Sequence, residues 1–352
     1  MKSLIAKKML WHALDTLTRP NPEPLVWDLN ILAVNRCNQN CPMCNAGILT
    51  QRQTQMMSVD AFCRYADMLA NLEIPVCTIS GGEPTLVPDM PAIIAEAAQR
   101  FPQVMLISNF YTKPKLMLRV AEAILRNNAR IICSFDGFGE VADRLRGAPD
   151  VSDVVCQNLE LVTELKQELR SESILEIHTV ISDDNLSQVD DMLALSARLG
   201  WVHTVAPRNS PAQMPRPPEG VGLTPSEELD VATSKILRAP NVTQLHSYIK
   251  GIPLYAEGTY EKFCPYLTPG LRTMKVFLEP NGDVSLCDRT PIGNLNTASL
   301  TGILQGSAYR AFIDRAEACR GCWLSCFTEP ALAVRPTHVV DALRHRQPTA
   351  TR

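Results

Sequence analysis

Three cysteines lie within eight residues of one another in this chain of 352 residues, at Cys37, Cys41 and Cys44. Polar residues and a proline separate them, so the three cannot form one apolar face of a buried helix or strand. Structural zinc sites are normally closed by a fourth protein ligand, which this loop does not supply. The loop therefore predicts a [4Fe–4S] cluster with one iron left open for a substrate or cofactor.

The composition is that of an ordinary globular protein, with 45% hydrophobic and 20% charged residues. A net charge of −3, without a basic cluster, argues against a nucleic-acid partner. The sequence has no apolar run long enough to span a membrane and no signal-peptide pattern, so we expect a cytoplasmic protein. Clustering of the cysteines favours metal ligation in a reducing compartment over a disulfide framework.

Residues 1–24 are expected to form a separate N-terminal segment. Apolar residues recur at helical spacing over residues 1–17, lysines lie elsewhere, and three prolines follow. This pattern predicts an amphipathic helix that packs on the protein's own flank. Contact with a membrane surface is the less favoured alternative.

The next part of the chain alternates short β-branched apolar runs with helical patterns. Strands are predicted over residues 25–34, 75–80, 104–108, 130–134, 174–181 and 201–206, and helices over 60–72, 116–125, 151–169 and 186–199. Such alternation predicts a parallel sheet that gathers its ligands at the carboxyl ends of its strands. Single cysteines inside these elements are read as core residues, at Cys63, Cys77, Cys133 and Cys156.

A glycine loop follows the second predicted strand, at Gly81, Gly82 and Glu83. The two glycines allow the backbone to approach a ligand closely, and the glutamate offers a carboxylate to a cationic amine. Because this loop follows the cysteine loop by one strand–helix–strand unit, both are expected at the same edge of the sheet.

The C-x3-C-x2-C loop and the following Gly-Gly-Glu resemble the motifs of the radical S-adenosylmethionine (radical SAM) superfamily. Residues 134–147, with Ser-Phe-Asp-Gly and Asp-Arg-Leu-Arg-Gly, resemble a further stretch of that family. The resemblance implies a partial (β/α)6 barrel over residues 25–210. It also implies that SAM binds through its amino group to Glu83, through its carboxylate to Ser134 and Arg146, and near its ribose to Asn109. Met43 stands where the family prefers an aromatic residue, which weakens the expectation of a ring beside the adenine.

Several of these residues have plainer interpretations. Arg146 taken alone is more typical of a surface ion pair than of a carboxylate clamp, although a bidentate Arg–carboxylate contact is chemically apt. His178 is more typical of a core histidine. Arg208 and Asp136 are candidate site residues by position only.

Residues 211–258 are expected to be a linker and a helix, because residues 208–222 are rich in proline and glycine and a helical pattern covers 225–237. This loop either lines the substrate entrance or simply joins two domains. Residues 331–352 are expected to form a C-terminal tail.

A second cysteine set lies in residues 259–330. A strand over 273–278, a turn at 279–283 and a returning strand over 284–287 predict a hairpin. The candidate ligands in this part are Cys264, Cys287, Cys319, Cys322 and Cys326. Four or five thiols suit one tetrahedral site, either an iron–sulfur cluster or a structural zinc ion.

This half resembles the cysteine-rich SPASM and twitch domains that follow radical SAM cores. Five cysteines are too few for the two clusters of a full SPASM domain, so the twitch version is favoured, with one auxiliary [4Fe–4S] cluster. Its expected ligands are Cys264, Cys287, Cys319 and Cys322, which leaves Cys326 as a spare or substitute ligand.

The resemblance implies an enzyme that receives an electron from a partner such as flavodoxin or ferredoxin and cleaves SAM to a 5′-deoxyadenosyl radical. The radical abstracts hydrogen from a substrate, and the auxiliary cluster favours an oxidation. Only residues 1–24 precede the first strand, which is too short for a peptide-recognition domain, so a small-molecule substrate is preferred to a ribosomally made peptide. A non-catalytic iron–sulfur carrier is a further alternative, which the glycine loop argues against.

Overall fold

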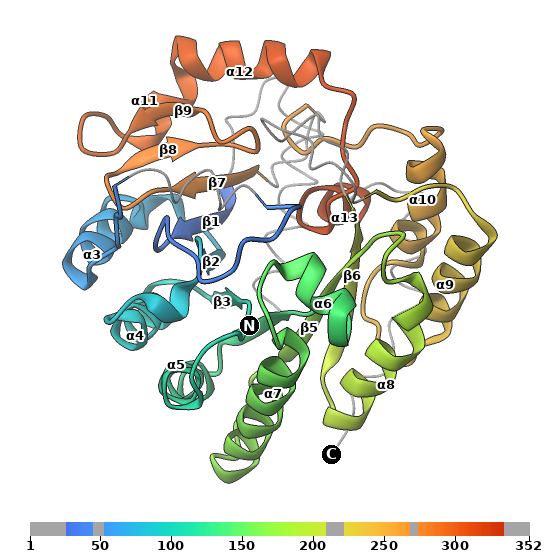
Figure 1. Ribbon diagram of the computed structural model, residues 1–352. Coiled ribbons are helices and arrows are strands. Elements are labelled where there is room, and N and C mark those ends of the chain that lie inside the picture. Colours follow the sequence, from blue (N-terminus) through green and yellow to red (C-terminus); the bar gives the residue numbers. More distant parts are fainter. Residues whose placement is uncertain (1–25, 45–52, 209–221, 268–273, 334–352) are drawn as a thin grey trace.

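The computed structural model describes residues 26–44, 53–208, 222–267 and 274–333 (Figure 1). Within these residues, the strands form one sheet in the order β6-β5-β4-β3-β2-β1-β7-β8-β9. The strands are β1 (Val26–Leu32), β2 (Val76–Ser80), β3 (Gln103–Ser108), β4 (Arg130–Ser134), β5 (Leu175–Ile181), β6 (Val202–Pro207), β7 (Met274–Leu278), β8 (Asp283–Ser285) and β9 (Pro291–Asn294). The first six match the strands predicted from apolar runs.

Strands β1 to β6 are parallel, and each pairs with the next along the chain. In Figure 1 helices line the outer side of the curved sheet, while α13 lies near the centre of the molecule. Strands covered on both faces need mostly apolar sequence, which explains why four of the five residues of β2 are buried. The predicted α/β fold with a partial (β/α)6 barrel is confirmed.

The helices and 3-10 turns of the core are α3 (Val59–Met68), η1 (Ala70–Leu72), η2 (Pro84–Leu86), α4 (Met90–Arg100), α5 (Pro114–Arg126), α6 (Gly139–Arg146), α7 (Val151–Glu168), η3 (Leu186–Gln188) and α8 (Val189–Leu199). The later helices are α9 (Glu227–Arg238), α10 (His246–Glu257), α11 (Leu300–Gln305), α12 (Ser307–Ala318) and α13 (Ser325–Ala333). Ser58 caps α3, because its side chain accepts a hydrogen bond from the amide of Ala61 at 3.2 Å.

The cysteine-rich half does not form a separate sheet. Strand β7 pairs in parallel with β1, and β8 and β9 add antiparallel strands beyond it. A buried ion pair between Asp28 of β1 and Lys275 of β7, at 2.9 Å, joins the two strands. The sequence predicted this hairpin as part of an appended domain, whereas the hairpin extends the sheet of the barrel. The predicted limits of the domains stay predictions.

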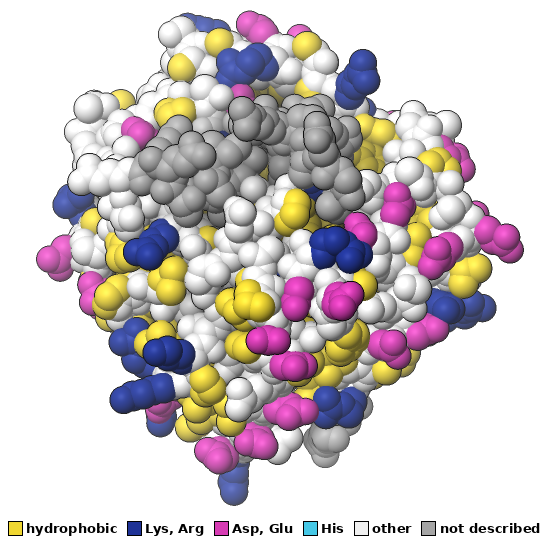
Figure 2. Space-filling model, viewed as in Figure 1, with side chains coloured by type: hydrophobic (Ala, Val, Ile, Leu, Met, Phe, Trp, Pro, Cys, Tyr) yellow, Lys and Arg dark blue, Asp and Glu magenta, His cyan; other side chains and the backbone are white. Residues whose placement is uncertain are grey.

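The predicted N-terminal helix, the loop over residues 209–221 and the tail beyond residue 333 lie outside the described residues. In the described part of the chain, no helix combines the length and apolar character needed to cross a bilayer. On the face shown in Figure 2, the described acidic and basic side chains are interspersed. Of the four single cysteines predicted to be core residues, Cys77 and Cys133 are buried, while Cys63 and Cys156 are half-buried against the core.

Candidate active site

A cavity of about 280 Å³ lies at the carboxyl ends of β1 to β6. It is lined by every core residue that the sequence predicted for cluster or SAM binding, namely Cys37, Cys41, Met43, Cys44, Gly81, Gly82, Glu83, Asn109, Ser134 and Arg146. The sheet brings these residues together because parallel strands end at the same edge. Their placement agrees with the predicted site, and their individual roles stay predictions.

Backbone contacts hold the cysteine loop against the glycine loop. The amide of Gly82 donates to the carbonyl of Val34 at 2.6 Å, and the amide of Glu83 donates to the carbonyl of Arg36 at 2.9 Å. A Cβ atom on Gly82 would lie only 2.0 Å from the Arg36 carbonyl oxygen. Glycine is therefore required at this position to let the two loops touch.

Glu83 is completely buried beneath the cavity. Its carboxylate accepts hydrogen bonds from the amide of Thr85 at 3.0 Å, the hydroxyl of Ser108 at 2.8 Å and the amide of Asn109 at 2.8 Å. Burial raises the pKa of Glu83, and these hydrogen bonds oppose the rise. The carboxylate thus joins the glycine loop to the end of β3 and still lines the cavity.

Asn109 links the end of β3 to the cysteine loop. Its side-chain amide donates to Asn38 Oδ1 at 2.8 Å and lies 3.7 Å from the sulfur of Cys37. Asn109 is therefore placed to hold the loop as well as a ligand beside it. Ser134 ends β4 at the cavity wall.

Arg146 is buried at the end of α6 and pairs with Asp136 at 2.7 Å. Asp136 in turn accepts a hydrogen bond from the amide of Val180 at 2.8 Å. The surface ion pair considered from the sequence is thus a buried one. Within the described residues, Nε of Arg146 is buried without a hydrogen-bond partner, so one donor of this guanidinium is left for a ligand.

The C-terminal end of α6 also contacts the cysteine loop. The Cys41 thiol lies 3.4 Å from the Arg146 carbonyl oxygen, which accepts its hydrogen bond. Gly147 follows in the left-handed conformation, and a Cβ there would lie 2.2 Å from the Asn40 carbonyl oxygen. The Arg-Gly pair therefore supports the loop through backbone contacts that the sequence prediction did not include.

The donor set of this cavity fits a cluster and an anionic cofactor. Burial raises the pKa of Cys37 to about 11 and also raises the pKa of Cys41, so the thiolate forms need a compensating positive centre. Among the described residues, no three side chains have the spacing that a single metal ion requires. The ligands of a cubane cluster lie further apart than the ligands of a single metal ion. Nε2 of Gln39 is a further buried donor without a partner among the described residues.

Two residues named from position alone, His178 and Arg208, line the cavity, as does Leu324, which the sequence did not reveal. Nη1 of Arg208 donates to the carbonyl of Met43 at 3.0 Å and so supports the cysteine loop from β6. Burial lowers the pKa of His178, which favours the neutral imidazole. Nδ1 of His178 lies 2.8 Å from the hydroxyl of Thr204.

Four thiols of the second cysteine set lie close together. Burial raises the pKa of Cys287, and the nearby Cys264, Cys322, Asp288 and Cys319 raise it further. These neighbours fit the predicted ligand set of Cys264, Cys287, Cys319 and Cys322. Cys326 is exposed and lies near Lys275 and Asp28, and it also lies near Tyr266, as do Cys264, Cys287 and Cys322, so its spare or substitute role stays a prediction.

An aromatic cluster centred on Trp323 supports this group. Its indole nitrogen donates to the carbonyl of Tyr248 at 3.0 Å, and the Tyr248 hydroxyl donates to the Trp323 carbonyl at 2.8 Å. Lys262 donates to three carbonyls at the end of α12, including that of Cys319 at 2.6 Å. These hydrogen bonds therefore fix the loops that carry Cys319 and Cys322 without help from a cluster.

A partial barrel that gathers three thiols, a glycine loop and a buried carboxylate at its carboxyl edge defines a cluster-binding protein of the radical SAM type. The sequence profile described as the radical SAM superfamily matches residues 31–196. The profile of SPASM, an iron–sulfur cluster-binding domain, matches residues 271–323. The chain belongs to the radical SAM superfamily and carries a SPASM domain after its barrel. Its cofactors are accordingly a [4Fe–4S] cluster with SAM and auxiliary iron–sulfur centres.

Similar curated proteins fall into two groups. A PqqA peptide cyclase of Granulibacter bethesdensis is 24% identical over 344 residues, covering 87% of this chain and 87% of that protein. An AdoMet-dependent heme synthase of Methanosarcina barkeri is 24% identical over 183 residues, covering 51% of this chain and 49% of that protein. The chain thus spans only about half the length of the heme synthase.

Solved structures share the fold. The structure of Streptococcus suis SuiB bound to the precursor peptide SuiA has a TM-score of 0.64 at 14% identity, covering 93% of this chain and 75% of that one. The structure of anSMEcpe with bound AdoMet has a TM-score of 0.61 at 16% identity, covering 87% of this chain and 88% of that one.

Proposed function

We propose that this protein is a radical SAM enzyme that oxidises or cross-links a peptide substrate. The observation that carries the peptide assignment is the match to PqqA peptide cyclase, which covers 87% of each chain and so extends well beyond the barrel. When bound, the cluster and SAM supply a one-electron cleavage that yields a 5′-deoxyadenosyl radical able to abstract hydrogen from carbon.

The chain's own residues would hold the cofactors and orient them. Cys37, Cys41 and Cys44 are proposed to hold the cluster, and Arg208 and Asn109 support the loop that carries them. Glu83 is proposed to bind the amino group of SAM. Ser134 and the remaining donor of Arg146 are proposed to bind its carboxylate, because an arginine–carboxylate contact is strong and directional. The surrounding apolar residues exclude water from the reacting atoms.

The auxiliary centre is proposed to be a [4Fe–4S] cluster on Cys264, Cys287, Cys319 and Cys322. The thiols of these residues are close enough to raise one another's pKa, which a bound cluster would relieve. A structural zinc ion is the alternative. Electrons are proposed to come from flavodoxin or ferredoxin, in the cytoplasm.

A small-molecule substrate is the second candidate. The observation that favours it is the match of the barrel to AdoMet-dependent heme synthase, whose name refers to a small tetrapyrrole product. This match covers about half of each chain, so it supports the radical chemistry more than the substrate. A short precursor peptide encoded beside this protein would favour the peptide substrate.

The test compares iron, acid-labile sulfide and EPR spectra of the wild type with those of a variant in which Cys37, Cys41 and Cys44 are all alanine. After anaerobic reconstitution we expect about eight irons in the wild type and about four in the variant. SAM should change the EPR spectrum of the wild type only and should be cleaved by it under reducing conditions. An intact cluster that neither responds to SAM nor cleaves it would refute the proposal and leave an electron carrier.

A further inference from the structure

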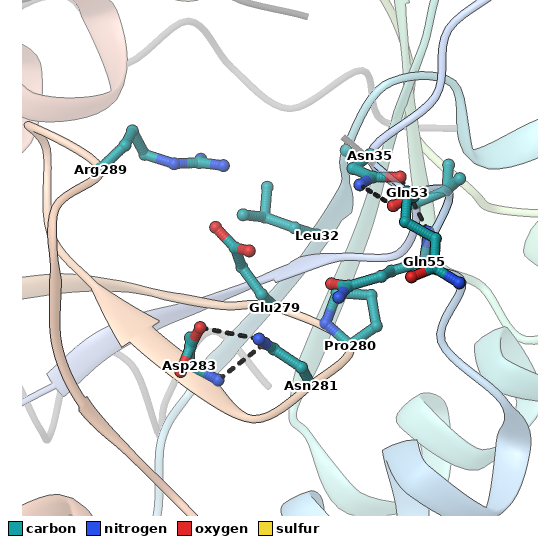
Figure 3. A pocket seen from close by; sticks show the side chains of 11 residues that line it. Leu32, Asn35, Gln53, Gln55, Glu279, Pro280, Asn281, Asp283 and Arg289 are labelled. Atoms are coloured by element: carbon teal, nitrogen blue, oxygen red, sulfur yellow. Dashed lines mark hydrogen bonds between the residues drawn. The ribbon is translucent and has the colours of Figure 1, made fainter. Parts of the chain in front are cut away.

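A second cavity, of about 110 Å³, lies beside the candidate active site (Figure 3). It is formed where the end of β1, residues 53–55 and the turn after β7 meet, and Gly81 lines both cavities. Its polar side chains come from Asn35, Gln53, Gln55, Glu279, Asn281, Asp283 and Arg289. A ligand in this cavity would therefore lie next to the SAM site without occupying it.

Arg289 enters the cavity from a strained backbone position. Its φ is +60°, the left-handed region that a side chain other than glycine or asparagine rarely adopts. The half-buried guanidinium lies over the ring of Phe277, 4.6 Å from its centroid. Among the described residues it has no ion pair or side-chain hydrogen bond, and its Nε is buried. Backbone strain retained for an unpaired charge is typical of a functional residue.

Glu279 provides the opposite charge. It follows β7, and in Figure 3 its carboxylate and the Arg289 guanidinium reach into the same cavity. Within the described part of the chain, the carboxylate of Glu279 also lacks an ion pair or side-chain hydrogen bond.

Several buried and half-buried charges of the described residues form ion pairs. Asp28 pairs with Lys275 at 2.9 Å and Asp136 with Arg146 at 2.7 Å. Asp288, the direct neighbour of Arg289, pairs with Arg315 at 2.8 Å. Glu279 and Arg289 differ from these pairs, because they line one cavity and form no ion pair with each other among the described residues. Charged groups held apart in this way are ready to bind a ligand that carries both charges.

Two residues that line the cavity are close in sequence to the two cysteine sets. Asn35 precedes Cys37 of the first set by two residues, and Arg289 follows Cys287 of the second set by two residues. The cavity is therefore built from chain segments next to both sets, through residues that no motif of the two sets includes.

We infer that Glu279 and Arg289 form a substrate subsite that binds a unit carrying one carboxylate and one ammonium group. The carboxylate binds Arg289 and the ammonium binds Glu279. Such a unit is either a free amino-acid-like molecule or a pair of oppositely charged side chains in a peptide. The subsite presupposes the proposed radical enzyme function, because it is a place for the substrate of that enzyme.

Binding is measured on the full-length, anaerobically reconstituted protein by equilibrium dialysis with two labelled probes. γ-Aminobutyrate represents the free zwitterion, and N-acetyl-glutamyl-lysine amide represents the peptide. We expect at least one probe to bind with a Kd below about 10 mM. Arg289→Gly and Glu279→Gln should each weaken that binding about tenfold or more, because each removes a hydrogen bond between charged groups. Arg126→Gln, an exposed change on α5, is the matched control and should alter binding less than about twofold.

Arg289→Gly also separates a binding role from a structural one. Glycine accepts the left-handed conformation, so the midpoint of thermal unfolding should stay at or above that of the wild type while probe binding is lost. Preference for one probe identifies the source of the charged unit. Absence of binding by both probes, or binding unchanged in both variants, overturns the subsite. Iron content and the SAM-induced EPR change are recorded on the same samples, and their loss in the wild type would refute the proposed function instead.

Discussion

Gly251 of α10 lies against the ring of Trp323, so replacing this glycine with alanine has two opposing effects on stability. A Cβ on Gly251 would lie 1.9 Å from Cζ2 of Trp323, so the ring must move by about 1.5 Å to reach ordinary carbon–carbon contact. Trp323 is only 3% exposed, and its two hydrogen bonds to Tyr248 hold it in place. Overpacking and loss of these bonds cost about 2–4 kcal/mol, against a gain of about 1 kcal/mol in helix propensity.

Gly251→Ala should therefore lower the free energy of unfolding of the reduced, cluster-free protein by about 2 kcal/mol. It should also lower iron incorporation at the auxiliary site, because Cys322 precedes Trp323. Gly302→Ala is the matched control: this exposed glycine of α11 meets only the Ser299 hydroxyl, at 3.3 Å, so the substitution should raise stability by up to about 1 kcal/mol through helix propensity.

Urea unfolding of Gly251→Ala in a Trp323→Leu background isolates the contact in a double-mutant cycle. The smaller leucine leaves room for the new methyl group, so the penalty of Gly251→Ala should largely disappear. A penalty of equal size in both backgrounds, or no penalty in either, would show that the Gly251–Trp323 contact does not limit this helix pair.

Three further predictions concern the barrel. Asp136→Asn should lower the free energy of unfolding by about 3 kcal/mol in urea titrations, because it leaves Arg146 as an unpaired buried charge. Asp184→Asn, which removes the partner of the exposed Arg144 on the same helix as Arg146, should cost less than about 1 kcal/mol. Burial lowers the pKa of His203 to about 3. Below the usual pKa of histidine, the unfolded chain therefore binds a proton that the folded protein does not bind. Between pH 5 and 6 stability should thus fall with decreasing pH by about 1.4 kcal/mol per unit more steeply in the wild type than in His203→Gln; equal slopes would contradict this assignment. Ser58→Ala should cost about 1 kcal/mol in the same assay by removing the cap of α3.

The barrel strands could be predicted because each is an apolar run bounded by turn residues. The cap of α3 at Ser58 could be predicted for a similar local reason. The candidate active site was predictable in its residues because Cys37, Gly81 and Glu83 follow predicted strands, and parallel strands bring such residues to one edge. Local pattern and topology together were sufficient there.

Contacts between distant parts of the chain could not be predicted in the same way. Pairing of β7 with β1 joins segments more than two hundred residues apart, and a hairpin pattern does not specify which edge it joins. Arg289 looked like any charged loop residue, because neither its left-handed φ nor its position in the second cavity leaves a sequence signal. The ion pair of Arg146 was considered, but only the fold shows that it is buried.

The pairing of β7 with β1 has a consequence for both sites. Lys275 and Asp28 face each other inside the barrel, where a one-residue slip of β7 would move Lys275 to the opposite face and leave Asp28 unpaired. Breaking a buried pair costs about 3–5 kcal/mol, which strongly favours the observed register. The same register sets the position of Glu279, which directly follows β7. The ion pair deep in the barrel therefore specifies where the charged cavity lies relative to the first cysteine loop.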